Sequence, residues 1–89
     1  MDPTFEWDDE KAQSNLAKHG VSFEVVRALD WSELVVKPDG RFDYDEQRWR
    51  ALSVAYRLVI VFTIRGDLYR IISVRRAHGK EIRRWAGLS

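Results

Sequence analysis

The chain contains no cysteine, and none of its apolar runs approaches the about 20 residues that a membrane-spanning helix needs. The lack of cysteine excludes disulfide bonds and thiolate nucleophiles, and it fits a reducing compartment. The first ten residues are acidic and contain no apolar segment of the kind found in secretion signals. These absences predict a soluble, cytoplasmic protein.

A length of 89 residues indicates a single domain that spans residues 1–89. A domain of this size buries only roughly 60–65% of its unfolded surface, so its stability alone is modest and a protein partner would add to it. No internal repeat, low-complexity tract or linker interrupts the sequence.

Charge is distributed unevenly along the chain. Residues 1–47 hold 12 of the 14 Asp and Glu residues, whereas residues 48–89 hold 10 of the 15 Lys and Arg residues. Most of these cations are arginines, which bind phosphate through two points, so the basic half favours a polyanionic ligand such as a nucleic acid. The alternative is that the two halves neutralise each other through weak surface ion pairs.

The stretch at 57–76, RLVIVFTIRGDLYRIISVRR, predicts the centre of the fold. Residues 58–64 are rich in Val and Ile, which is typical of a central strand that is covered on both faces. Gly66-Asp67 predicts a two-residue hairpin turn that places Arg65 opposite Leu68. The second half alternates between polar and apolar residues, as a half-buried strand does.

This register predicts which arginines share a face of the sheet. With strict alternation, Ser73 lies opposite Ile60 and Arg75 lies opposite Leu58, so Ser73 and Arg75 share one face. The other face then carries a second set: Arg65, Arg70 and Arg76. A slip of one residue would exchange the two sets.

The N-terminal half predicts an edge strand and two helices. The edge strand is expected at 5–7, and Asp8 and Gly20 delimit a helix over residues 9–19. Its inward face is expected to consist of Ala12, Leu16 and His19. Ser22 begins a second, short helix, and its inward residues are Phe23, Val26 and Leu29.

The remaining segments complete an α+β domain. Strands are expected at 34–36 and 49–55, with a loop at 41–47 between them. A basic helix at 77–86 packs on the sheet through Ile82 and Trp85. The predicted fold thus has two N-terminal helices, a mostly antiparallel sheet of about four strands and a C-terminal helix.

Several stretches together resemble the BrnT toxins of bacterial type II toxin–antitoxin systems. They are FEWDDEKAQSNLAKHGVSFE, DEQRW and LVIVFTIRGDLYRIISVRRA, followed by a basic helix that contains a glutamate. The most specific parts are Trp7-Asp8, residues 18–23 and residues 70–77, which occur in the order and spacing of that family. The chain departs from it at His78, where Thr or Ser is more common, at Trp85, where Tyr is common, and at 53–56, where a glycine is missing.

The resemblance implies a RelE-like ribonuclease fold, RNA cleavage that arrests growth and neutralisation by a BrnA-like antitoxin encoded beside the toxin. It also implies that this antitoxin is a ribbon-helix-helix protein, so that operator DNA is contacted only through the antitoxin. Two other functions fit the residues as well. One is a non-catalytic module that binds nucleic acid or an antitoxin, and the other is a structural subunit whose charge halves drive self-association.

Metal-free RNA cleavage needs a base for the ribose 2′-hydroxyl, cations for the charge on the phosphorane and an acid for the departing 5′-oxygen. Arg75 and Arg76 are the first candidates for the cations, because no acidic residue adjoins them in the sequence. Arg65 at the turn and Arg48 are expected to support them. Such arginines can also simply keep a sheet edge soluble.

Proton transfer and RNA binding have further candidates. On the resemblance, Lys18 contacts phosphate or moves a proton, although a cation at this helix end also favours the helix dipole. His19 is either an RNA contact or a structural histidine, and His78 is either an acid–base group or a helix cap. Glu46 acts as a general base or orients Arg48. Three more RNA contacts are expected at Arg70, Arg83 and Arg84.

No metal ion or other cofactor is expected. Asp8, Asp9 and Glu10 are explained as negative charge at a helix N-terminus. Asp43, Asp45 and Glu46 lack the spacing and the histidine support that would favour a magnesium site.

The acidic half of the chain and its aromatic residues are expected to bind the antitoxin. The aromatic residues in question are Phe42, Tyr44 and Trp31. The antitoxin should be basic where it meets them, because complementary charge favours specific association.

Overall fold

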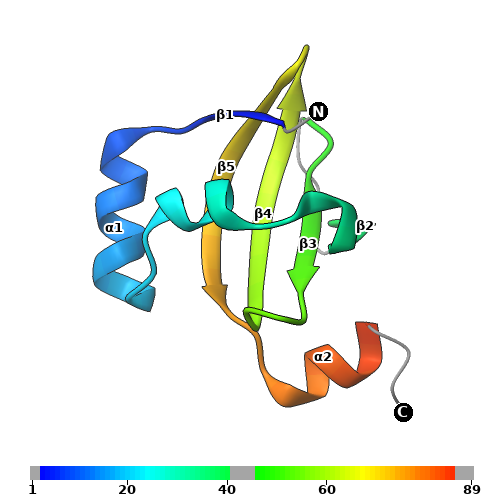
Figure 1. Ribbon diagram of the computed structural model, residues 1–89. Coiled ribbons are helices and arrows are strands. Elements are labelled where there is room, and N and C mark those ends of the chain that lie inside the picture. Colours follow the sequence, from blue (N-terminus) through cyan, green and yellow to red (C-terminus); the bar gives the residue numbers. More distant parts are fainter. Residues whose placement is uncertain (1–2, 41–45, 86–89) are drawn as a thin grey trace.

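The computed structural model describes residues 3–40 and 46–85, so most of the loop expected at 41–47 falls outside the described residues. The strands are β1 (Thr4–Glu6), β2 (Val35–Pro38), β3 (Trp49–Ser53), β4 (Leu58–Arg65) and β5 (Leu68–Arg76). They form one sheet in the order β1-β5-β4-β3-β2 (Figure 1). The α-helices are α1 (Asp9–His19) and α2 (Gly79–Trp85), and two 3₁₀ helices are η1 (Phe23–Ala28) and η2 (Trp31–Glu33).

The α+β class is confirmed, and two details of the prediction are corrected. The sheet has five strands because the N-terminal segment does pair with β5, and it pairs in the parallel direction. The second helix is 3₁₀ rather than α and is followed by another 3₁₀ turn. Phe23 and Val26 are buried at a spacing of three residues, which is the repeat of a 3₁₀ helix.

β4 is the central strand, and its first six residues are buried. The hairpin turn forms as expected, since Arg65 pairs with Leu68 and Gly66 takes a φ of 60°. One end of β4 connects to β3 through a tight turn at 54–57, in which Arg57 adopts a φ of 56°. The sheet therefore has an apolar centre with both ends of its middle strand closed by short turns.

The register of the hairpin changes at a β-bulge. Phe62 pairs with Ile71, whereas the adjacent Val61 pairs with Ser73, so Ile72 is the extra residue of β5. Beyond the bulge Arg75 pairs with Val59 and Arg76 with Leu58. The predicted pairs Ser73 with Ile60 and Arg75 with Leu58 are therefore wrong by one residue.

The bulge redistributes the arginines between the two faces of the sheet. We call the face that carries Leu58, Ile60 and Phe62 the η face, because Phe23 and Val26 of η1 pack on it. The opposite face carries Val59 and, at one end, Ile82 and Trp85 of α2, and we call it the α2 face. Paired residues on adjacent strands point to the same face. By this rule the α2 face carries Arg65, Arg70, Ser73 and Arg75, and the η face carries Arg76.

The expected separation of Arg75 from Arg65 and Arg70 is therefore wrong, because the prediction assumed a strand without a bulge. The expected common face of Ser73 and Arg75 is confirmed. Arg76 is the residue that faces the other way.

Helix α1 begins and ends where the sequence predicts. Asp8 accepts hydrogen bonds from the backbone N–H groups of Glu10 and Lys11, and Gly20 ends the helix in the left-handed conformation. Its inward face is different from the prediction, because Leu16 is 51% exposed. Asn15 is buried in its place, with 7% of its surface exposed.

Asn15 occupies the interior because, within the described residues, β5 has no neighbouring strand at Val74. β1 pairs only with Leu68, Tyr69 and Arg70, and α1 lies along the rest of the β5 edge (Figure 1). The Asn15 side chain donates to the carbonyl of Val74 at 2.8 Å and accepts from its N–H at 3.2 Å. It also donates to the carbonyl of Val21 at 3.1 Å. The amide of Asn15 thus makes the pair of hydrogen bonds that another strand would make.

The other segments lie close to their expected positions. The second and third strands of the chain differ slightly from the predicted ranges, since β2 extends to Pro38 and β3 ends at Ser53. α2 starts at Gly79, two residues later than predicted, and it buries Ile82 and Trp85 as predicted. Within residues 3–40 and 46–85, no helix is long and apolar enough to cross a membrane.

Replacing Asn15 by alanine should destabilise the fold strongly. The substitution leaves the N–H and C=O of Val74 and the C=O of Val21 without their partner, which should lower the free energy of unfolding by about 2–4 kcal/mol. The matched control is Leu16→Ala on the exposed side of the same helix, with an expected change of at most about 0.5 kcal/mol. Urea unfolding of both variants measures the difference, and equal losses would contradict this role of Asn15.

Candidate functional site

A cavity of about 220 Å³ lies between α1 and the bulged part of β5. We call it the α1–β5 cavity, and its lining consists of Lys11, Ser14, Asn15, Lys18, His19, Ile72 and Ser73. Lys11 and Lys18 are seven residues apart, which places them on the same side of a helix. Two lysines and one histidine therefore line one small cavity, which suits a phosphate group.

Two of the predicted site residues, Lys18 and His19, meet in this cavity. Lys11 and Ser73 were missed by the sequence analysis. The position of Lys11 could have been found, because it lies one heptad before Lys18. Ser73 could not, because only the bulge brings it against α1.

Arg75 extends this basic region along β5. It lies on the same face as Ser73 and two residues further along the strand, a distance of about 7 Å. Its two terminal nitrogens each donate to one carboxylate oxygen of Glu81, both at 2.7 Å. This two-point contact holds the guanidinium at the junction between β5 and α2.

Glu81 is held as firmly as Arg75. Its carboxylate also accepts the backbone N–H of His78 at 2.9 Å, at the start of α2. The hydrogen bonds from Arg75, followed by that from the His78 N–H, lower the pKa of Glu81 from 4.5 to about 2. Glu81 is thus ionised at neutral pH and neutralises Arg75, so the expectation that Arg75 has no acidic partner is wrong.

Three more arginines of the sheet contact carboxylates from the acidic half of the chain. Arg50 lies 3.7 Å from Asp39, Arg65 lies 3.4 Å from Glu46, and Arg70 lies 3.6 Å from Glu6. The pairing of the two charge halves, proposed above as an alternative, accounts for these residues. Among the described residues, the cations with no carboxylate within 4 Å include Lys11, Lys18, Arg57, Arg76, Arg83 and Arg84.

The predicted site residues do not form one cluster. Arg65 and Glu46 lie near the hairpin turn. Arg75 pairs with Val59, which is six residues from Arg65 along β4, a distance of about 20 Å. Arg48 immediately precedes β3 and is partly buried, and His78 precedes α2. Glu46 contacts Arg65 instead of the expected Arg48.

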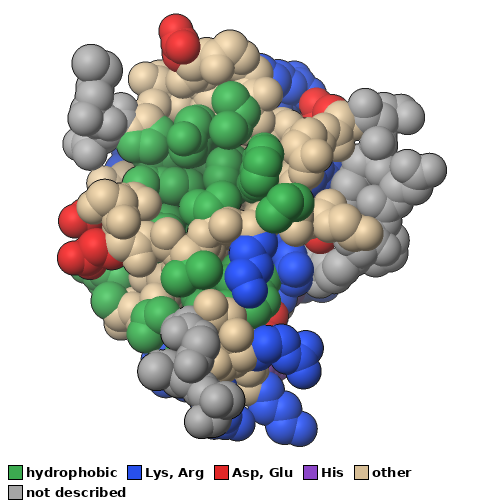
Figure 2. Space-filling view, turned by 90° about the vertical axis from the view of Figure 1, so that its right-hand side faces the viewer, with side chains coloured by type: hydrophobic (Ala, Val, Ile, Leu, Met, Phe, Trp, Pro, Cys, Tyr) green, Lys and Arg blue, Asp and Glu red, His purple; other side chains and the backbone are tan. Residues whose placement is uncertain are grey.

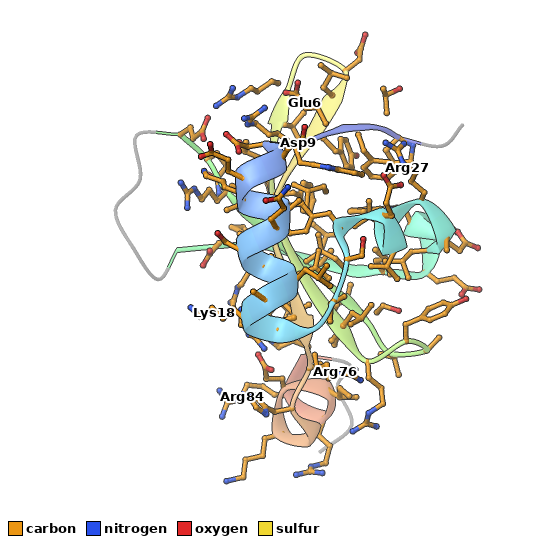
Figure 3. All side chains as sticks on the ribbon, turned by 90° about the vertical axis from the view of Figure 1, so that its left-hand side faces the viewer. Glu6, Asp9, Lys18, Arg27, Arg76 and Arg84 are labelled. Atoms are coloured by element: carbon orange, nitrogen blue, oxygen red, sulfur yellow. The ribbon has the colours of Figure 1, made fainter. Side chains whose placement is uncertain are left out.

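Figure 3 shows which of the labelled cations lie together. Lys18 at the end of α1 and Arg84 on α2 extend toward the same side of the molecule, while Arg76 lies on the other side of the β5 edge. This arrangement agrees with the register, which places Arg76 on the η face. The cavity itself is lined by cations of α1, and Arg75 on β5 and Arg84 on α2 lie on the same side of the molecule.

A family model of the ribonuclease toxins BrnT, from type II toxin–antitoxin systems, matches residues 7–81. This chain belongs to the BrnT family. The match includes both walls of the α1–β5 cavity and the pair of Arg75 and Glu81. Members of the family are ribonuclease toxins, and a type II toxin has an antitoxin as its partner.

The crystal structure of the ribonuclease toxin BrnT from Brucella abortus has a similar fold. It superimposes with a TM-score of 0.61 at 24% sequence identity, and the alignment covers 86% of this chain and 99% of that one. At this identity the likeness shows the fold that the two chains share. No curated protein matches this chain.

Replacing Glu81 by glutamine should remove a pH-dependent part of the stability. Because the pKa of Glu81 is lowered on folding, its contribution is complete above pH 4.5 and is lost as the pH falls toward 2. The variant should be less stable at pH 7 by about 1–2 kcal/mol, and the gap to the parent protein should close between pH 4.5 and 2.

Urea unfolding at a series of pH values measures this gap. Glu33→Gln is the control, because Glu33 is exposed and has no cation within 4 Å among the described residues. A gap for Glu81→Gln that stays constant down to pH 2 would show that the carboxylate charge is not its source.

Proposed function

We propose that this BrnT-family chain is a metal-independent endoribonuclease of the cytoplasm whose active site is the α1–β5 cavity, and that a BrnA-like antitoxin neutralises it. The observation that carries the proposal is the convergence of Lys11, Lys18 and His19 next to Ser73 in one cavity. Family membership supports the ribonuclease class, and the cavity supplies the groups that RNA cleavage needs.

The proposed reaction is attack of a ribose 2′-oxygen on the adjacent phosphorus. A base removes the proton of the 2′-hydroxyl, the bond from phosphorus to the 5′-oxygen breaks, and an acid protonates that oxygen. The products are a 2′,3′-cyclic phosphate and a free 5′-hydroxyl. The reaction is an internal transesterification, so it needs no water molecule, oxidant or other reactant besides the RNA.

Lys11 and Lys18 stabilise the negative charge that develops on the phosphorane, because both lysines line the cavity and neither ammonium group has a carboxylate within 4 Å among the described residues. His19 moves the proton, since an imidazole has ring nitrogens that can accept and donate a proton. Arg75, fixed by Glu81, contacts the neighbouring phosphate about 7 Å further along β5.

Beyond the cavity, the RNA runs along the cations that lie on the same side of the molecule as Lys18. Arg83 and Arg84 on α2 are exposed, and Arg84 extends to the side of Lys18 (Figure 3). Arg70 and Arg65 lie further along the α2 face, toward the hairpin turn. These positions support phosphate contacts on several successive nucleotides rather than a role in one reacting phosphate.

Non-catalytic binding of RNA is the alternative, and the ion pairs of Arg65, Arg70 and Arg75 favour it. Arginines that are fixed by carboxylates can hold a polynucleotide in register without stabilising a transition state. A binding module of this kind would retard RNA in a gel without shortening it.

Replacing Lys18 by alanine should reduce RNA cleavage by about 10- to 1,000-fold, because it removes a cation next to the reacting phosphate. The matched control is Arg76→Ala, which removes one positive charge from the η face and should leave cleavage within about threefold of the parent. Cleavage of a labelled RNA by each purified variant measures both effects. Full activity of a folded Lys18→Ala protein would refute this active site.

Cleavage should persist at its full rate in excess EDTA, because the proposed step uses only protein cations. Within the described residues, no three His, Cys, Asp or Glu side chains are grouped in a way that could bind a metal ion. The same RNA substrate, incubated with and without added magnesium after dialysis against EDTA, provides the measurement. Loss of activity in EDTA that magnesium restores would refute the metal-independent mechanism.

A further inference from the structure

A second, larger cavity lies away from the proposed active site. It has a volume of about 550 Å³ and lies between η2 and the turn that joins β3 to β4. We call it the η2 groove, and the lining residues used below are Asp30, Glu33, Leu34, Val54, Ala55 and Tyr56. Because Leu34 and Trp31 pack on the apolar core of the η face, the groove belongs to that face and not to the face of Arg75.

Exposed apolar side chains lie in this groove and also elsewhere on the η face. Tyr56 and Val54, which are 57% and 42% exposed, line the groove itself. Val36 and Ile64 are exposed next to Trp31 in a separate cavity of about 220 Å³, which lies toward the hairpin turn. Figure 2 shows apolar side chains gathered on the side of the molecule that carries β2. A patch of this kind on a small soluble domain marks a surface that another molecule covers.

The groove also carries uncompensated negative charge. Asp30 and Glu33 have no cation within 4 Å among the described residues, and no Lys or Arg lines the groove. By contrast, Glu6, Asp39, Glu46 and Glu81 each contact an arginine. One Asp30 oxygen accepts the N–H and hydroxyl of Ser32, which fixes this carboxylate at the rim.

We propose that the η2 groove binds a basic, amphipathic segment of the antitoxin, with apolar side chains on Leu34, Val54 and Tyr56 and Lys or Arg side chains on Asp30 and Glu33. This proposal depends on the proposed function, in which an antitoxin restrains the toxin. Complementary charge favours this occupant. RNA would place its phosphates against two carboxylates, and a second copy of the chain would bring the same two carboxylates to the contact.

The location separates binding of the antitoxin from inhibition of cleavage. The groove lies on the η face, whereas Arg75 lies on the α2 face. An antitoxin segment in the groove therefore anchors the complex without touching Arg75, and another part of the antitoxin blocks RNA. Changes in the groove should consequently weaken neutralisation and leave cleavage intact.

The test uses the double variant Glu33→Lys with Tyr56→Ala, which reverses one rim charge and removes the largest exposed apolar side chain of the groove. Its affinity for the purified cognate antitoxin, measured by titration calorimetry, should fall by at least 100-fold, and the affinity of the parent should decrease with added NaCl. RNA cleavage by the variant alone should equal that of the parent. Co-expression of the antitoxin should then no longer rescue growth.

The matched control is Glu10→Lys with Leu16→Ala, which makes the same kinds of change on α1, where both residues are exposed. It should bind the antitoxin within about threefold of the parent. Urea unfolding of each variant verifies that it is folded; if the double variant is unfolded, Glu33→Lys alone replaces it, with an expected loss of at least tenfold.

Three outcomes would overturn the proposal. The first is unchanged antitoxin affinity of the folded groove variant. The second is a loss of RNA cleavage by that variant, which would place the groove in the RNA site. The third is a parent protein that dimerises in solution and a groove variant that is monomeric, which would assign the groove to a second copy. Because calorimetry measures binding without catalysis, it decides this proposal even if the parent fails to cleave RNA.

Discussion

The hydrogen bonds between Asn15 and the backbone of β5 are the contacts on which the arrangement of the site depends. β5 is nine residues long, but β1 covers only three of them. The edge that remains needs partners for its buried N–H and C=O groups, and the Asn15 amide provides them at Val74. A helix can replace a strand at this edge only if it presents such an amide, which fixes both the position and the rotation of α1. The same rotation directs Lys11 and Lys18 to the cavity beside the bulge.

The bulge at Ile72 determines which arginines lie on the same face of the sheet. Without it, Arg75 would leave the face of Arg65 and Arg70, and Arg76 would take its place. With it, a row of polar side chains, Arg70, Ser73 and Arg75, occupies one face of β5 while Ile71 and Val74 both remain in the core. A single inserted residue thus allows a strand to keep its apolar contacts on one side and to align its polar residues on the other.

Those parts of the fold that depend on neighbouring residues could be predicted from the sequence. Asp8, Gly20 and Ser22 mark helix ends, Gly66 and Asp67 make the hairpin turn, and the Val-rich run forms the central strand. Contacts between distant residues could not be predicted. Nothing local distinguishes Leu16 from a core residue or Asn15 from a surface one, because the deciding partner, Val74, is 59 positions away.

For the candidate site, too, the sequence predicted single residues but not their contacts with distant residues. The sequence analysis named Lys18 and His19, which lie in the cavity, and Arg75, which lies two residues beyond Ser73 on the same face of β5. It did not indicate that Glu81 neutralises Arg75, since this pair forms only when α2 folds back onto β5. Nor could the sequence show that Glu6, Asp39 and Glu46 each contact an arginine of the sheet, because strand order determines those contacts.

The short length of α2 has a consequence for the electrostatics of the α2 face. An isolated helix of seven residues is not stable in water, so α2 depends on the packing of Ile82 and Trp85 on Leu52 and Val59 and on the pair of Glu81 with Arg75. When this small cluster opens, Glu81 leaves with the helix and the positive charge of Arg75 is no longer compensated. The net charge at this end of β5 therefore depends on how often the four apolar side chains of the cluster separate. It varies with temperature and with any ligand or substitution that changes the stability of the cluster.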